Sequence, residues 1–147
     1  MTRPIYETAH DRQRQHAAAR VFGQKLKAQM VATPPQTRHD YDAFREGRLV
    51  GQVEVKCRTN PMSKYPTYAI SADKVDALLA LGRPVAIVVQ WSDVLGWCRL
   101  KDETHRTMGG RWDRGDPADR EMVAHYPISV FRVLKSSRRT GTGTSSP

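Results

Sequence analysis

The 147-residue sequence lacks most features of secreted, membrane-spanning or disulfide-stabilised proteins. It has only two cysteines, Cys57 and Cys98, and each stands in an apolar stretch where a small buried side chain is the simplest interpretation. The longest apolar run, residues 85–89, is far shorter than the roughly 20 residues that cross a bilayer. The N-terminus has no apolar core of the kind a signal peptide needs. We therefore expect a soluble, cytoplasmic protein with no membrane partner.

Several catalytic signatures are also missing. The sequence contains no GxxxxGK[ST] phosphate loop, no GxSxG nucleophile motif and no HExxH zinc motif. The five histidines are scattered and show no zinc spacing with the cysteines. These absences argue against a P-loop enzyme, a serine hydrolase and a histidine-centred metal nuclease.

What the sequence does have is positive charge: 24 Lys and Arg stand against 15 Asp and Glu, a net charge of +9. Such an excess favours a polyanionic partner, most simply nucleic acid, because each neutralised phosphate releases counterions. The length favours a single domain. We expect that domain over residues 1–135, followed by a disordered basic Ser/Thr/Gly tail over residues 136–147.

The pattern of apolar residues and turn formers predicts an α+β chain. A helix is expected over about residues 6–30, with an apolar stripe that includes Ala17, Ala18 and Phe22, ended by Pro34 and Pro35. The expected elements that follow are a hairpin of strands 41–44 and 49–58, a short strand 67–70, a helix capped by Ser71 and closed at Gly82, strands 84–91 and 94–100, a charged Gly-rich loop 102–120, and an apolar stretch 122–134.

The hairpin carries the chemistry we consider most informative. On an alternating strand, Val53, Val55 and Cys57 face the core, whereas Glu54 and Lys56 project from the opposite face, about 6.6 Å apart at roughly 3.3 Å per residue.

Pairing within the hairpin decides whether a carboxylate of the first strand joins Glu54. A two-residue loop at Glu46-Gly47 would place Asp42 opposite Gly51, on the core face. A three-residue, bulged loop would place it opposite Gln52, on the polar face. We expect the second arrangement.

Two carboxylates that converge in this way can hold a hard cation such as Mg²⁺ through oxygen ligands. The cation would polarise a phosphoryl oxygen, while an adjacent lysine orients water and offsets charge on the phosphate. Plainer interpretations remain open: Glu54 and Lys56 as an exposed ion pair, and Asp42 as a turn residue. Asp40 has the same strand parity as Asp42 and is an alternative ligand.

Together, Asp42, the glycine turn, the apolar strand and Glu54-Val55-Lys56 resemble the PD-(D/E)XK nuclease superfamily, and most closely its small phage and bacterial members that are similar to Holliday-junction resolvases. The resemblance covers roughly residues 5–100. It implies an αβββαβ restriction-endonuclease-like core, with a mixed central sheet flanked by helices.

The resemblance also implies a site. Asp42, Glu54 and the backbone carbonyl of Val55 would bind Mg²⁺, or Mn²⁺ in its place, and Lys56 would serve the attacking water. Glu7 on the first helix is a further candidate ligand, and Lys74 on the second helix is a candidate supporting residue.

A basic and aromatic mixture elsewhere suits DNA, with unpaired bases stacking on the aromatic rings. The candidate DNA-binding residues are Arg58, Lys64, Tyr68, Arg111 and Arg114.

These features predict a Mg²⁺-dependent DNA endonuclease that hydrolyses phosphodiester bonds, with a specificity for junctions or branched DNA as one option, in phage or bacterial DNA processing or recombination. A phage-encoded protein would act in the host cytoplasm. A junction resolvase would require a homodimer to make paired cuts. The alternatives are a catalytically silent nuclease fold that binds DNA or serves in assembly, and a basic RNA-binding protein.

Overall fold

The structure is a computed structural model that describes residues 9–37, 39–101, 105–110 and 120–136. Its helices and strands are α1 (Ala9–Leu26), β1 (Gln29–Ala32), β2 (Tyr41–Arg45), β3 (Arg48–Cys57), the 3-10 turn η1 (Met62–Lys64), β4 (Thr67–Ser71), α2 (Ala72–Leu79), β5 (Val85–Gln90), β6 (Val94–Arg99), β7 (His105–Gly110), β8 (Arg120–Pro127), the 3-10 turn η4 (Ile128–Val130) and β9 (Arg132–Ser136).

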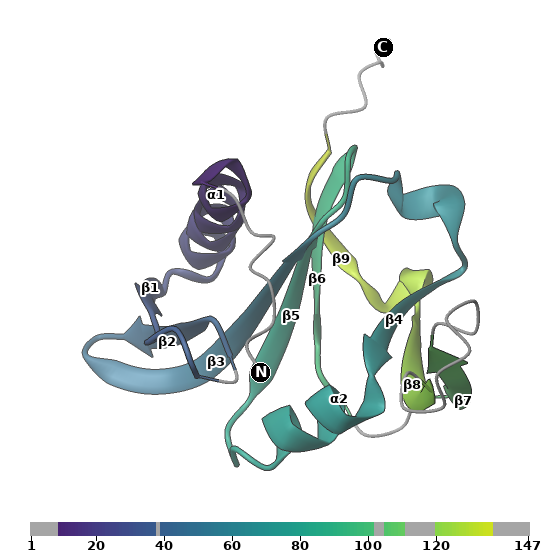
Figure 1. Ribbon diagram of the computed structural model, residues 1–147. Helices are drawn as coiled ribbons and strands as arrows, with labels where there is room; N and C mark the ends of the chain where they lie inside the picture. The colour runs from purple at the N-terminus through teal and green to yellow at the C-terminus, as the bar shows by residue number, and fades with distance from the viewer. Residues whose placement is uncertain (1–8, 38, 102–104, 111–119, 137–147) are drawn as a thin grey trace, which may run out of the picture.

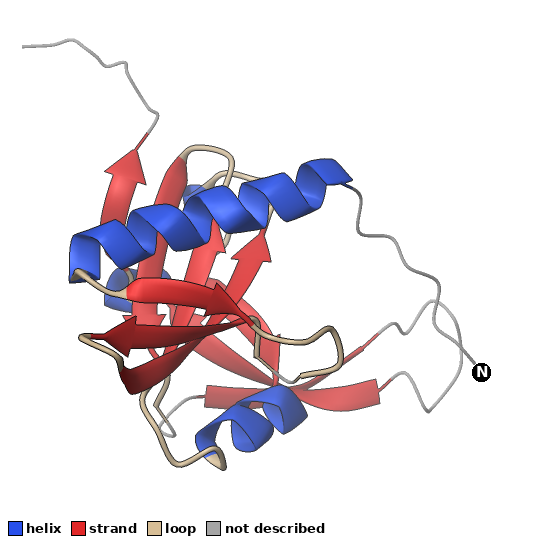
Figure 2. Cartoon of the chain, turned by 90° about the vertical axis from the view of Figure 1, so that its left-hand side faces the viewer, coloured by secondary structure: helices blue, strands red, loops and turns tan. Residues whose placement is uncertain are grey.

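The strands form two sheets. A six-stranded sheet has the order β1-β2-β3-β5-β6-β9, and a three-stranded sheet has the order β4-β8-β7. The larger sheet is mixed, because β3 and β5 run parallel whereas its other neighbouring strands are antiparallel. Helix α1 lies across one face of this sheet, and α2 with the smaller sheet lies on the other side (Figures 1 and 2). The predicted α+β fold with a mixed central sheet is confirmed.

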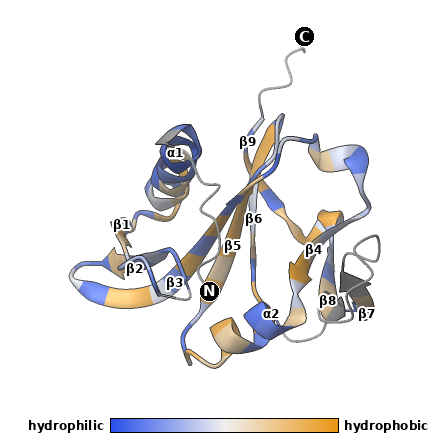
Figure 3. Cartoon of the chain, in the orientation of Figure 1, coloured by the Kyte–Doolittle hydropathy of each residue, from blue (hydrophilic) through white to orange (hydrophobic). Residues whose placement is uncertain are grey.

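Two hydrophobic clusters bury the two faces of the larger sheet. On the α1 side, Ala18, Ala19 and Phe22 pack with Val53 and Val55. On the opposite side, the buried cluster joins the larger sheet to α2 and the smaller sheet through Val75, Leu78, Ile87, Val89, Trp91 and Tyr126, among others. The apolar colouring of β4, β5 and β8 in Figure 3 follows this second cluster. Strands β3 and β5 are therefore covered on both faces.

The hairpin confirms one part of the prediction and corrects another. Asp42 does pair with Gln52, as expected. The loop, however, has two residues, Glu46 and Gly47, both with positive φ (52° and 76°), which is the geometry that two-residue hairpin turns favour. The register shifts further along the strands, because Phe44 pairs with Leu49 whereas Ala43 pairs with Gly51. The bulge thus lies within β3 and not in the loop.

A close approach of the backbone accompanies this bulge. A Cβ atom added at Gly51 would lie 2.9 Å from the carbonyl oxygen of Pro84, a separation that a side chain could not tolerate without a shift. Next to it, the backbone N–H of Gln52 donates to the same Pro84 oxygen (2.9 Å). Glycine at this position therefore lets β3 approach the start of β5.

Several expected boundaries were wrong. Helix α1 ends at Leu26, where Lys27 has a positive φ of 56°, and the segment predicted as its last turn forms β1. Residues 105–110, predicted as loop, form β7, whose partner is β8. In the apolar stripe of α1, Ala17 is exposed and Ala19 takes its place. Ser71 is the N-cap of α2 as predicted, but its side chain makes no capping hydrogen bond.

In the described part of the chain, no helix is both long and apolar enough to span a bilayer. The expected tail begins at Ser136, which is the last residue of β9; residues 137–147 lie outside the described residues.

Candidate active site

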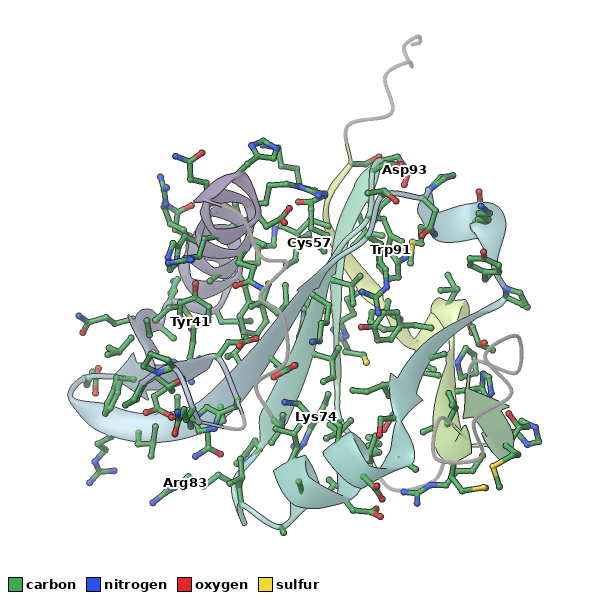
Figure 4. All side chains as sticks on the ribbon, viewed as in Figure 1. Tyr41, Cys57, Lys74, Arg83, Trp91 and Asp93 are labelled. Atoms are coloured by element: carbon green, nitrogen blue, oxygen red, sulfur yellow. The ribbon has the colours of Figure 1, made fainter. Side chains whose placement is uncertain are left out.

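Glu54 is the centre of the candidate site. It lies in the middle of β3, beside Ile87 of β5, with only 1% of its surface exposed. Two lysines contact its carboxylate: Lys56 Nζ lies 3.4 Å from Oε2, and Lys74 Nζ lies 3.6 Å from Oε1. Oε1 is fully buried and has no hydrogen-bond partner. The side chain of Lys74 extends from α2 toward the larger sheet (Figure 4).

The environment of Glu54 opposes its negative charge on balance. Burial, followed by the negative charge of Asp40, raises the pKa of the Glu54 carboxyl above its ordinary value of 4.5, and the positive charges of Lys56 and Lys74 offset this only in part. A buried carboxylate with incomplete compensation destabilises a fold. A divalent cation would supply the missing positive charge.

Asp40 is the carboxylate that interacts electrostatically with Glu54, because its negative charge raises the pKa of the Glu54 carboxyl. Its Oδ2 accepts a hydrogen bond from the backbone N–H of Val55 (2.8 Å), and its own N–H donates to the carbonyl of Val53 (2.9 Å). These two hydrogen bonds therefore fix Asp40 against the middle of β3.

Asp42 occupies a different setting. It lies opposite Gln52, two positions before Glu54 on the same face of β3. Its Oδ1 lies 2.7 Å from Nε2 of His39, a side chain that is almost fully buried. Asp42 is thus on the expected face, but the group that the structure shows on its carboxylate is an imidazole.

His39 is a residue that we did not predict from the sequence. Its Nδ1 is buried without a hydrogen-bond partner, while Nε2 contacts Asp42. The available signal was its proximity along the chain to Asp40 and Asp42, which could suggest a turn but not a buried imidazole–carboxylate pair.

The two lysines differ from Glu54 in being reached by solvent. The side chains of Lys56 and Lys74 are 41% and 31% exposed, compared with 2% for the Glu54 side chain. Each ammonium group can therefore contact a bound phosphate or water while it neutralises the buried carboxylate. The expectation that Lys74 lies near Glu54 agrees with the geometry, and its supporting role remains a proposal.

Three of the candidate DNA-binding residues, Arg58, Lys64 and Tyr68, lie among the described residues. Arg58 directly follows β3, and its Nη2 donates to the hydroxyl of Tyr68 (3.1 Å). Lys64 is exposed, with its Nζ 5.5 Å from the ring centroid of Tyr65. Tyr68 is only 4% exposed and packs against Trp91, so the expectation that its ring stacks on a base in open solution needs correction.

The burial of Tyr68 has a clear cause and a chemical effect. Its strand β4 belongs to the core cluster between the two sheets. Burial raises the pKa of its hydroxyl to about 12, with Arg58 acting in the opposite direction. Tyr68 therefore stays protonated and supports Arg58. The other expected site residues, Glu7, Arg111 and Arg114, lie outside the described residues.

The oxygen ligands available here suit a small hard cation. Within the described ranges there is no cluster of three or more His, Cys, Asp and Glu side chains that could hold a metal ion. Two carboxylates and a backbone carbonyl are nevertheless a donor set that fits Mg²⁺, which is commonly bound through one or two carboxylates and keeps several waters. The buried Oε1 of Glu54, which has no hydrogen-bond partner and lies 3.6 Å from Lys74 Nζ, is an oxygen that such a cation could use as a ligand.

The fold is of the restriction-endonuclease-like class. The chain is similar to a solved structure of Archaeoglobus fulgidus Hjc, a Holliday junction resolvase from an archaeal hyperthermophile, with a TM-score of 0.51 and 16% sequence identity over 90% of this chain and 98% of that one. At this identity the similarity shows the fold.

The family follows from the sequence itself. A family model described as "Phage putative PDDEXK endonuclease" matches residues 1–134, so the chain belongs to this family of PD-(D/E)XK nucleases. The family predicted from the hairpin is thereby confirmed. No protein of curated function matches the chain.

Proposed function

We propose that the protein is a metal-dependent DNA endonuclease that hydrolyses phosphodiester bonds with Mg²⁺, for which Mn²⁺ can substitute. The observation that carries this proposal is Glu54: a buried carboxylate between two lysines, with one oxygen lacking a hydrogen-bond partner and a raised pKa. An arrangement that disfavours its own charge is typical of a functional site.

We assign the cation to Glu54, the carbonyl of Val55 and one carboxylate of the first hairpin strand. Asp40 is our first choice for that carboxylate, because it is coupled electrostatically to Glu54 and bonded to the Val55 N–H. Asp42, the residue expected from the sequence, is the second choice, because it is already paired with His39. Glu7 remains a further candidate ligand.

The residues of the chain divide the remaining work. When bound, the cation would polarise a phosphoryl oxygen and acidify a water. Lys56, whose ammonium lies within 3.4 Å of Glu54, orients the attacking water and balances negative charge that develops on the phosphate. Lys74 holds the other Glu54 oxygen from α2. Arg58, Lys64, Arg111 and Arg114 would contact the DNA backbone, consistent with the net charge of +9.

We further propose that the protein acts on branched or junction DNA in phage DNA processing or recombination. Support comes from the family and from the fold shared with a Holliday junction resolvase. A homodimer and action in the cytoplasm of the host belong to the same proposal.

A substrate panel tests the proposed activity. Supercoiled, linear, single-stranded and four-way-junction DNA are incubated with the protein in Mg²⁺ or in EDTA, beside the variant Lys56→Met. We expect cleavage in Mg²⁺ only, and a loss on the order of 10²-fold in Lys56→Met with DNA binding retained. Cleavage that continues in EDTA would refute the metal mechanism. Binding to every substrate without cleavage would instead support a silent DNA-binding module.

A further inference from the structure

A cavity of about 350 Å³ opens beside the carboxyl ends of β3 and β5. It is lined by, among others, Arg58, Asn60, Tyr65, Tyr68, Trp91 and His125. We refer to it as the base cavity. Its volume is within the range of pockets that hold small organic molecules, and its lining combines aromatic rings with a cation and an amide.

The inner wall of the base cavity is rigid. Tyr68 and Trp91 are almost fully buried, and their rings meet edge to face with centroids 6.2 Å apart. The guanidinium of Arg58 lies 5.0 Å from the centroid of the Tyr68 ring and also donates to the Tyr68 hydroxyl. The imidazole of His125 is held on both nitrogens by threonine hydroxyls, at 3.2 and 2.7 Å. The cavity therefore exists before any ligand binds.

The outer wall is different, because Tyr65 is 54% exposed. A large aromatic side chain that stays in solvent at the edge of a cavity offers a flat surface for stacking. The ammonium of Lys64 lies 5.5 Å from the Tyr65 ring and adds a positive charge at the same edge. This combination of a stacking ring and a neighbouring cation matches a nucleotide, with its planar base and its phosphate.

The base cavity is also aligned with the candidate active site. Glu54, Lys56 and Arg58 alternate along one strand direction, and Lys56 pairs with Val89, two residues before Trp91. Arg58 follows the end of β3, four positions after Glu54, which is about 13 Å along an extended chain at roughly 3.3 Å per residue. That is a span of about four stacked nucleotides at a rise of 3.4 Å, so one DNA strand could reach both places.

We propose that the base cavity receives an unpaired nucleobase of the DNA substrate, stacked on Tyr65, while Glu54 and Lys56 act on the same strand a few nucleotides away. This inference rests on the proposed nuclease function and names its substrate class. A paired base would first have to leave the duplex, at a cost of a few kcal/mol that an unpaired base does not incur. The cavity therefore selects DNA that carries unpaired nucleotides, such as gapped or bulged DNA.

Binding in EDTA tests this without any need for cleavage. The probes are a fluorescein-labelled duplex with one bulged 2-aminopurine and the same duplex fully paired. We expect tighter binding of the bulged probe and a fall in its 2-aminopurine fluorescence as the base stacks. Tyr65→Ala should weaken binding of the bulged probe about tenfold and of the paired probe less than twofold. Tyr65→Trp should retain the preference.

Met108→Ala is the matched control, since Met108 is 55% exposed on β7 and does not line the base cavity. It should leave the binding of both probes unchanged. Equal binding of the two probes by the natural protein, or equal weakening of both by Tyr65→Ala, would overturn the inference. Cleavage in Mg²⁺ is scored separately on the substrate panel described above: a failure to cleave any of those substrates refutes the nuclease and not the base cavity.

Discussion

The two faces of β3 are buried to nearly the same extent, but by different means. Val53 and Val55 are 1% and 0% exposed and pack against α1 in an apolar cluster. Glu54, which lies between them in the sequence, is also 1% exposed, yet it is surrounded by two lysines and carries an oxygen without a hydrogen-bond partner. One face of the strand follows the ordinary rules of packing, and the other violates them.

This contrast shows where the molecule gives up stability for chemistry. Burial of the valines stabilises the fold by about 25 cal/mol for each Å² of apolar surface. Burial of Glu54 does the opposite, because desolvation raises the pKa of its carboxyl and disfavours its charged form. Packing of the apolar face against α1 holds the strand in place, and this fixes the position of Glu54 on the opposite face. Substitutions on the two faces should therefore have opposite effects on stability and on activity.

The largest effect is expected from the pair Glu54→Gln and Val53→Ala. Glu54→Gln keeps the shape of the side chain but removes the charge that holds the cation, so cleavage in Mg²⁺ should fall on the order of 10³-fold. Val53→Ala should leave cleavage at 25 °C within about twofold and lower the free energy of unfolding by about 2 kcal/mol. Plasmid cleavage and urea unfolding of both variants measure this, and similar losses of activity in both would contradict the contrast.

The second effect separates the two candidate carboxylates of the hairpin. Asp40→Asn should reduce cleavage about 10²-fold. Asn can still accept the hydrogen bond from the Val55 N–H, but it removes the negative charge that, with Glu54, would hold the cation. Asp42→Asn should reduce it by about tenfold or less, as expected for a carboxylate that is paired with His39 and does not hold the cation. Initial rates at saturating Mg²⁺ provide the comparison. The reverse order would assign the ligand to Asp42, as the sequence first suggested.

The smallest effect concerns stability as a function of pH. Because the pKa of Glu54 is raised, the folded protein binds more protons than the unfolded chain between the ordinary value of 4.5 and the raised value, so stability falls as pH increases through this interval. Glu54→Gln removes that penalty. It should be more stable than the natural protein above the raised pKa, and the difference should vanish as pH falls toward 4.5.

Thermal unfolding in metal-free buffer across this range measures the difference. Glu46→Gln, in the exposed hairpin turn, is the control and should leave the pH dependence unchanged. A stability gain of Glu54→Gln that persists at low pH would show that its cause is packing and not charge.

The sequence was sufficient to predict that β3 has one apolar and one charged face, but not to predict where the bulge lies or that β1 is a strand. Strict alternation in β3 placed Glu54 and Lys56 on one face, and the family resemblance supplied the fold. The position of the bulge at residue 50 was not predicted; it lies beside the close approach of β3 to Pro84, a residue far from Gly51 along the chain. Strand β1 escaped notice because its four residues are largely exposed and show no clear alternation.

The choice between Asp40 and Asp42 likewise could not be made from sequence. Both residues have the same strand parity, so alternation places both on the side of Glu54. Only tertiary contacts distinguish them: Asp40 bonds to the backbone of β3, and Asp42 bonds to His39. Tyr68 fails for a related reason. The sequence predicted its strand and, from the basic and aromatic residues nearby, a ring available to DNA, whereas the ring is buried in the core cluster between the two sheets.

The central claim is that the face of β3 bearing Glu54 binds a divalent cation, and Mg²⁺ titration of thermal stability without DNA tests it most directly. The natural protein should gain stability as Mg²⁺ rises, by about 2.7 kcal/mol at a hundredfold excess over the dissociation constant. Glu54→Gln should start from a higher midpoint of unfolding and gain nothing, with NaCl of equal ionic strength as the control for both. An equal gain in the two proteins, or no gain in either, would contradict the account.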